Sequence, residues 1–255
     1  MKLPRYAFVL VLAWFAAFAT GRSADNSRVY EMRTYYTNPG KLPDLLARFR
    51  NHTVKIFEKH GMVNVGYWVP ADAKDNPDTT LIYVLEHKSR DAATASWKAF
   101  RDDPVWKDVA KKSEANGKIV AKVESVFLTA TDFSKAMNAG NGKGGRVFER
   151  RTYTAADGKQ AALDSRFRDH TVALFKKHGI TNLGYFHPVD ADKGASNTLV
   201  YFLAYPNREA AAASWKAFAA DADWMAARKA SEVNGKLTTK VESVYLTPTD
   251  FSAIK

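Results

Sequence analysis

The chain has 255 residues, of which 46% are hydrophobic and 25% are charged, so it is long enough and apolar enough to bury a large core. It contains no cysteine, and this excludes disulfides, thiolate metal ligands and a thiol nucleophile. The formal net charge is +11, but like charges never run for more than two residues. Because nucleic-acid arms concentrate their charge in blocks, we expect a solvated basic surface and no nucleic-acid partner.

The first 24 residues have the pattern of a secretory signal peptide. Lys2 and Arg5 precede an apolar run over residues 6–19, which is shorter than the roughly 20 residues needed to cross a bilayer. Residues 17–19 form an Ala-Phe-Ala cleavage candidate, and Ala24 is a second candidate. An uncleaved anchor is the alternative. We expect an exported protein, periplasmic or secreted, with no integral membrane segment after cleavage.

The rest of the chain is an internal duplication. When residues 29–134 are placed on residues 147–252 without a gap, 56 of the 106 pairs are identical. Between the copies, four of eight residues are glycine, which is typical of a flexible linker. We therefore divide the mature chain into a first repeat (25–137), a linker (138–146) and a second repeat (147–255).

The elements of the first repeat follow from its hydrophobic periodicity. Residues 29–36 alternate and are rich in β-formers, which predicts a strand. In residues 43–60, apolar side chains recur every three or four positions, which predicts a helix that Gly61 ends. The same reasoning predicts strands at 63–69, 80–87 and 122–129, and a helix over 91–116 with a kink at Pro104. The order strand, helix, strand, strand, helix, strand occurs twice.

This order of elements predicts an α+β fold made of two ferredoxin-like repeats. Each repeat forms a four-stranded antiparallel sheet with both helices on one face, which leaves the other face bare. Two copies in one chain can cover each other sheet to sheet, and they then close an α/β barrel within the chain, with a space between helices and sheet in each half. Further oligomerisation is left open. Two independent domains, including RNA-recognition domains, are the alternative, but residues 81–85 lack the basic and aromatic pattern of RNA readers.

Three segments of the first repeat resemble the NIPSNAP family of dimeric α/β-barrel proteins. They are residues 29–35 (VYEMRTY), residues 52–62 with their HT and FEKHGM motifs, and residues 65–70 (VGYWVP), and the second repeat carries the same pattern. The resemblance implies the barrel. It does not imply a reaction, because this family has no agreed activity and similar barrels include monooxygenases, haem degraders, isomerases and binding proteins. The second repeat departs from the first at Arg150, Phe186 and His187.

Both repeats keep a histidine at the edge of the apolar stripe of their first helix. On a helical wheel this position predicts the rim of the space between helix and sheet, where a histidine can contact a ligand or transfer a proton. A partly buried structural histidine is the alternative, and for the aromatic residues the alternative is simple core packing. The predicted ligand site comprises six shared residues: His52, Tyr67, Trp97, His170, Tyr185 and Trp215.

The polar residues Glu31, Arg33 and His60 are expected to be structural. Glu31 and Arg33 lie on one face of the first strand, and we favour a salt-bridged network with Glu124 and Glu242 inside the barrel over acid–base chemistry. His60, in the last turn of its helix, predicts a capping and packing role. We expect no metal and no cofactor, since two histidines eight residues apart on a helix are about 12 Å apart.

Three classes of function fit these observations. The favoured one is an exported binding protein that holds a small apolar ligand or a protein partner, because the usual nucleophile and metal motifs are absent. The first alternative is a cofactor-independent monooxygenase or haem-handling enzyme that uses His52 or His170. The second is a structural surface module. We assign no catalytic residue.

Overall fold

The computed structural model describes residues 28–137 and 145–255, so the predicted signal peptide and most of the predicted linker lie outside the described residues. None of the helices in these two ranges has the length and apolar character that a membrane crossing needs. The first half contains β1 (Val29–Thr37), α1 (Leu42–Arg48), the π-helical turn η1 (Phe49–Thr53), α2 (Val54–Lys59), β2 (Val63–Pro70), β3 (Thr80–His87), α3 (Arg90–Asp102), α4 (Pro104–Ser113) and β4 (Val120–Ala130).

The second half repeats this order. Its elements are β5 (Val147–Ala155), α5 (Gln160–Arg166), the π-helical turn η3 (Phe167–Thr171), α6 (Val172–Lys177), β6 (Thr181–Pro188), β7 (Thr198–Tyr205), α7 (Arg208–Ala219), α8 (Ala222–Ser231) and β8 (Thr238–Pro248). A short 3₁₀ turn follows the second strand of each half, at Ala73–Asp75 and Ala191–Lys193.

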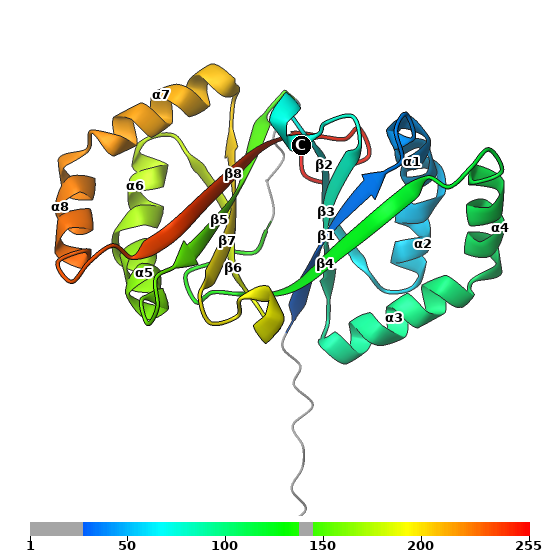
Figure 1. Ribbon diagram of the computed structural model, residues 1–255, viewed down its shortest axis with the longest axis horizontal. Helices are drawn as coiled ribbons and strands as arrows, with labels where there is room; N and C mark the ends of the chain where they lie inside the picture. Colours follow the sequence, from blue (N-terminus) through cyan, green and yellow to red (C-terminus); the bar gives the residue numbers. More distant parts are fainter. Residues whose placement is uncertain (1–27, 138–144) are drawn as a thin grey trace, which may run out of the picture.

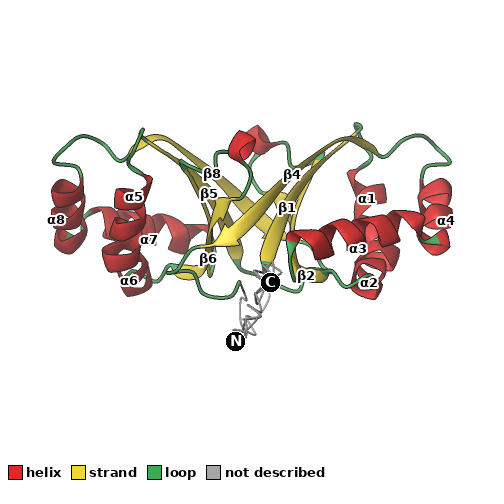
Figure 2. Cartoon of the chain, turned by 90° about the horizontal axis from the view of Figure 1, so that it is seen from below, coloured by secondary structure: helices red, strands yellow, loops and turns green. Residues whose placement is uncertain are grey.

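The eight strands close into one antiparallel barrel in the order β1-β3-β2-β8-β5-β7-β6-β4. Two ladders join the halves. Strand β2 pairs with β8 from Trp68 opposite Pro248, and β4 pairs with β6 from Leu128 opposite Pro188. The helices lie outside, in one layer on each side of the barrel (Figures 1 and 2). The predicted α+β barrel within one chain is therefore confirmed, and the alternative of two independent domains is wrong.

The barrel interior is filled by large apolar side chains from both halves. Trp68 stacks on Phe202 with ring centroids 5.7 Å apart, and it lies 5.9 Å from Phe148. Gly66 is required here, because a Cβ at that position would overlap the indole of Trp68. These residues lie on the sheet faces that each repeat would leave bare in isolation, and their burial holds the halves together.

The long helix predicted over residues 91–116 is broken and not merely kinked. Asp103 is extended between α3 and α4, and its carboxylate caps α4 by accepting from the backbone N–H of Val105. Asp221 breaks the second half in the same way, although Ala222 stands where the first half has Pro104. The aspartate cap, and not the proline, therefore sets the break.

The capping aspartate also explains His60. Its Nε2 lies 2.7 Å from Oδ2 of Asp103, and Lys59 Nζ lies at the same distance from that oxygen. His178 repeats the contact with Asp221 at 2.7 Å. The structural role predicted for His60 is confirmed, with the difference that it ties the end of α2 to the start of α4.

We expect a fragment comprising residues 25–137 to dimerise or aggregate. The fragment would expose the interior face of its sheet, which the second half covers in the full chain. An exposed apolar sheet face tends to associate with another. Size-exclusion chromatography with light scattering measures this, with the full mature chain as the control. A soluble monomeric fragment would contradict the expectation.

Candidate functional site

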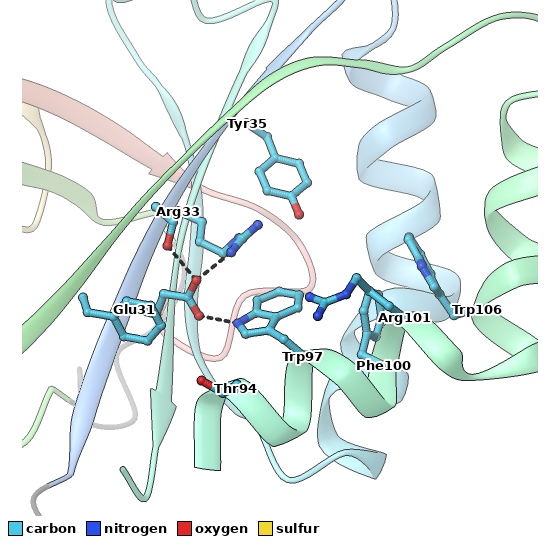
Figure 3. Close-up of a pocket in the computed structure, with 10 residues that line it drawn as sticks. Glu31, Arg33, Tyr35, Thr94, Trp97, Phe100, Arg101 and Trp106 are labelled. Atoms are coloured by element: carbon cyan, nitrogen blue, oxygen red, sulfur yellow. Dashed lines mark hydrogen bonds and ion pairs between the residues drawn. The ribbon is translucent and has the colours of Figure 1, made fainter. Parts of the chain in front are cut away.

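The first half contains a cavity of about 450 Å³ between the helices and the sheet (Figure 3). Strand alternation places every second residue of β1 and β4 on this side, and α3 and α4 supply the opposite wall. The lining residues are Glu31, Arg33 and Tyr35 from β1, Ser125 and Phe127 from β4, Thr94, Trp97, Phe100 and Arg101 from α3, and Trp106 from α4.

Glu31 is the polar centre of the cavity wall and is only 1% exposed. Its Oε1 accepts hydrogen bonds from Arg33 Nη1 at 2.6 Å and from Ser125 Oγ at 2.7 Å. Its Oε2 accepts from Trp97 Nε1 at 2.6 Å and from His87 Nε2 at 3.1 Å. These four donors come from β1, β4, α3 and β3, so one carboxylate joins the helix layer to three strands.

The surroundings of Glu31 keep it ionised. Burial by itself would raise the pKa of this carboxyl group, but the hydrogen bond from His87 and the charge of Arg33, followed by the bonds from Ser125 and Trp97, lower the pKa to about 2. A carboxylate with two donors on each oxygen and so low a pKa is a weak base. Glu31 therefore builds the wall of the cavity and is poorly suited to proton abstraction.

Arg33 lies on the aromatic wall. Its guanidinium carbon is 4.3 Å from the centroid of the Trp97 ring and 5.6 Å from that of Tyr35. Nη1 is engaged by Glu31, whereas Nη2 donates no hydrogen bond within the described part of the chain. The side chain is 17% exposed, so this free end reaches the cavity.

Arg101 is the second cation of the cavity. It follows Trp97 by one helical turn, and Figure 3 shows its guanidinium beside the indole of Trp97, over the cavity. No carboxylate of the described ranges lies within ion-pair distance of it. Its neighbour Asp102 is already paired with Lys98 at 2.7 Å.

The second half keeps the carboxylate but not its surroundings. Glu149 accepts from Arg151 at 2.6 Å, Ser243 at 2.6 Å and Trp215 at 3.0 Å, and Tyr205 donates at 2.6 Å where the first half has His87. At the positions that correspond to Thr94, Arg101 and Phe127, the second half has Ala212, Ala219 and Tyr245.

A smaller cavity of about 210 Å³ in the second half lies elsewhere. Phe167, Trp224 and Arg228 are among its lining residues, whereas Glu149, Arg151 and Trp215 are not. The two halves thus share a scaffold and differ in their hollows.

The structure brings only some of the predicted ligand residues together. Trp97 lines the cavity, but Tyr67 does not: it is fully buried, its hydroxyl bonds to Asn64 and its ring stacks on Tyr83. His52 is exposed and lines a separate hollow on the outer side of the helices, beside Arg48.

The second-half residues are placed in the same way. Tyr185 is buried with its hydroxyl on Asn182, and Trp215 bonds to Glu149. His170 is exposed in an outer hollow beside Ala226. The expected rim position of both histidines in the helix-to-sheet space is therefore wrong, and a ligand-binding role for the six residues stays a prediction.

A π-helical turn explains the misplaced histidines. His52 lies within η1 and His170 within η3, and a π turn holds more residues than the α-helix assumed by the wheel. Each residue in the turn therefore advances by a smaller angle around the helix axis than it would in an α-helix. Thr53 rotates inward to be buried, with its hydroxyl donating to the carbonyl of Arg48 at 3.2 Å, and His52 rotates outward.

The expected network of Glu31 with Glu124 is also wrong. In the β1–β4 register, Glu31 lies opposite Phe127 and Glu124 lies opposite Thr34, so the two carboxylates face opposite sides of the sheet. Ser125, one residue along, is the true partner, and strand alternation alone would have found it. Arg101 was not predicted, because the predicted site comprised only residues that both repeats share and Ala219 stands at its position in the second repeat.

Within residues 28–137 and 145–255, no group of three or more histidine, aspartate or glutamate side chains is arranged to hold a metal ion.

Comparison with known proteins identifies the two repeats. The NIPSNAP family model matches residues 30–135 and again residues 148–253. No curated protein matches the chain.

Among solved structures, a protein from Lactobacillus acidophilus NCFM named a putative monooxygenase aligns with a TM-score of 0.56 at 11% identity, covering 89% of this chain and 96% of that one. An anthrone oxidase-like protein aligns equally well, with a TM-score of 0.56 at 11% identity over 91% of this chain and 95% of that one. A NIPSNAP family protein from Agrobacterium tumefaciens str. C58 is 22% identical over 42% of this chain and 95% of its own, with a TM-score of 0.36.

We expect the double variant His52→Ala with His170→Ala to leave the free energy of unfolding within about 0.5 kcal/mol per site, because both side chains are exposed. Thermal and chemical unfolding measure this. His60→Ala is the matched control and should cost about 1–3 kcal/mol, since it removes one of the hydrogen-bond partners of the buried Asp103 carboxylate. A large loss in the double variant would contradict the exposed placement.

We expect Glu31→Gln to destabilise the fold by about 3–5 kcal/mol at neutral pH, because it leaves buried Arg33 without its counter-charge. The folded-state pKa of Glu31 lies below its ordinary value, so its contribution is present above about pH 4.5 and is lost as the pH falls toward 2. The difference in the free energy of unfolding between wild type and variant should therefore become smaller as the pH falls from 4.5 toward 2. Exposed Glu124→Gln is the control and should change stability by about 0.5 kcal/mol or less. A constant difference down to pH 2 would argue against the low pKa.

Proposed function

Because the chain belongs to the NIPSNAP family through both of its halves, we propose that it is an exported binding protein that holds a small aromatic molecule in the first-half cavity. The observation that carries the proposal is the composition of this cavity. Its walls are aromatic (Tyr35, Trp97, Phe100, Trp106 and Phe127), and its central carboxylate is already saturated by protein donors.

The aromatic walls favour a flat ligand. Phe100 packs against Trp106 with ring centroids 4.4 Å apart and lies edge-on to Trp97 at 5.6 Å, so the rings are fixed by one another before any ligand arrives. Trp97 is held further by its bond to Glu31. A preorganised aromatic surface binds a planar molecule with little loss of side-chain entropy.

Export rests on the sequence of residues 1–24, with its basic start and short apolar run. The mass of the N-terminal peptide of the protein recovered outside the cytoplasm tests it, and an N-terminus after Ala19 or Ala24 is the expected result.

A cofactor-independent monooxygenase is the second candidate. Two structural neighbours of similar fold have names of this kind, and His87 beside Glu31 is present only in the first half, where Glu31 lines the cavity between helices and sheet. The weak basicity of Glu31 favours binding over turnover. Oxygen uptake with dithranol, an anthrone, separates the two. We expect the rate to equal that of buffer, and protein-dependent uptake would favour the enzyme.

We expect naphthalene-based probes to bind the wild type saturably at one molecule per chain in isothermal calorimetry, and Thr94→Phe to abolish this binding. Thr94 is exposed and lines the cavity, so a phenyl ring there fills the space without disturbing the core. Ala212→Phe places the same ring at the equivalent exposed position of the second half and should leave binding intact. Binding that survives Thr94→Phe, or no saturable binding at all, would contradict the proposed function.

A further inference from the structure

We propose that the ligand of the first-half cavity carries a carboxylate group on its aromatic ring, that Arg101 together with the free end of Arg33 recognises this group, and that the second half takes no such ligand. This inference rests on the proposed function and names the class of molecule that the same cavity accepts.

Among the described residues, the charged groups of the cavity leave one positive charge without an ion-pair partner. Glu31 and Arg33 form an ion pair at 2.6 Å, so their charges cancel. Arg90, which lies over the Phe127 ring at the edge of the cavity, is paired with Asp190 from the second half at 3.2 Å. Arg101 remains, and a monoanion is the ligand charge that would neutralise it.

The geometry suits a planar anion. Arg101 and Trp97 lie one turn apart on the same face of α3, so a ring stacked on the indole would carry a substituent toward the guanidinium. From the strand side, Nη2 of Arg33 donates to no described residue and is positioned by the bond of Nη1 to Glu31. Two guanidinium groups on opposite walls match the two oxygens of a carboxylate better than one lysine would.

The second half lacks the cation of α3 on which the proposal depends. Ala219 stands at the position of Arg101. Arg151 keeps the place of Arg33, and its Nη2 makes only a long contact, 3.4 Å, with the hydroxyl of Tyr153. The second half does have two arginines at its own cavity, Arg166 and Arg228, but Glu232 pairs with them at 2.9 and 3.2 Å.

Calorimetry with 2-naphthoate and with its neutral analogue 2-naphthamide tests the inference. We expect the wild type to bind 2-naphthoate at one per chain, and at least about 10-fold more tightly than 2-naphthamide. Arg101→Ala should weaken 2-naphthoate by about 10-fold or more and change 2-naphthamide by less than about 2-fold. Arg101→Lys should restore part of the affinity for 2-naphthoate. Arg228→Ala removes an arginine from the second half and is the matched control, with no effect expected on either probe.

The outcomes separate this inference from the proposed function. Equal affinity for the two probes, unchanged in Arg101→Ala, would overturn the carboxylate preference while the aromatic site stands. Binding of two naphthoates per chain, or an equal loss in Arg228→Ala, would overturn the restriction to the first half. Failure of both probes to bind would overturn the proposed function and this inference together. Because Arg101 is exposed, its variants should unfold at the wild-type temperature, so lost binding would not reflect lost folding.

Discussion

A four-stranded sheet with helices on one side has a second apolar face that must be removed from water, and the rest of this molecule depends on that requirement. The two halves meet it by pairing β2 with β8 and β4 with β6, which turns two open sheets into one barrel without free edges. The seams need both repeats to keep the same strand lengths, and the inward-facing side chains must fit one another across the barrel. They need not be identical: Trp68 and Phe186, or Val84 and Phe202, differ between the halves, whereas most helix-facing residues of the strands are shared.

That outer side is organised by one buried carboxylate in each half. Glu31 and Glu149 accept hydrogen bonds from three strands and from a tryptophan of the covering helix, and these bonds fix the distance between helix and sheet. Because the scaffold is held in this way, neighbouring positions can change without collapse. Arg101 in one half and Ala219 in the other differ on an otherwise shared frame, and this difference is what distinguishes a candidate binding site from a structural half.

Predictions from the sequence were correct where one local pattern determined a residue's position, and wrong where the position also depended on tertiary packing. His60 was placed correctly because the end of a helix is marked by Gly61. His52 was misplaced because its prediction assumed uniform α-helical phase, and the π turn that shifts the phase is stabilised by tertiary burial of Phe49 and Thr53. Glu31 was matched to Glu124 because strand alternation was not applied to the β1–β4 pair, whereas its bonds to His87 and Trp97 depend on how β3 and α3 pack against β1.

The sequence by itself determined the duplication, the order of elements in each repeat and the closed barrel, because periodicity is local and a bare apolar sheet face has few ways to be covered. Only the tertiary structure decided which polar groups meet. The donors that saturate Glu31, the free end of Arg33 and the unpaired Arg101 depend on the register of β1 with β4 and on how α3 lies across them. Such contacts join residues that are far apart in the chain. Their hydrogen-bond geometry depends on packing to within fractions of an ångström, and hydrophobic periodicity does not predict it.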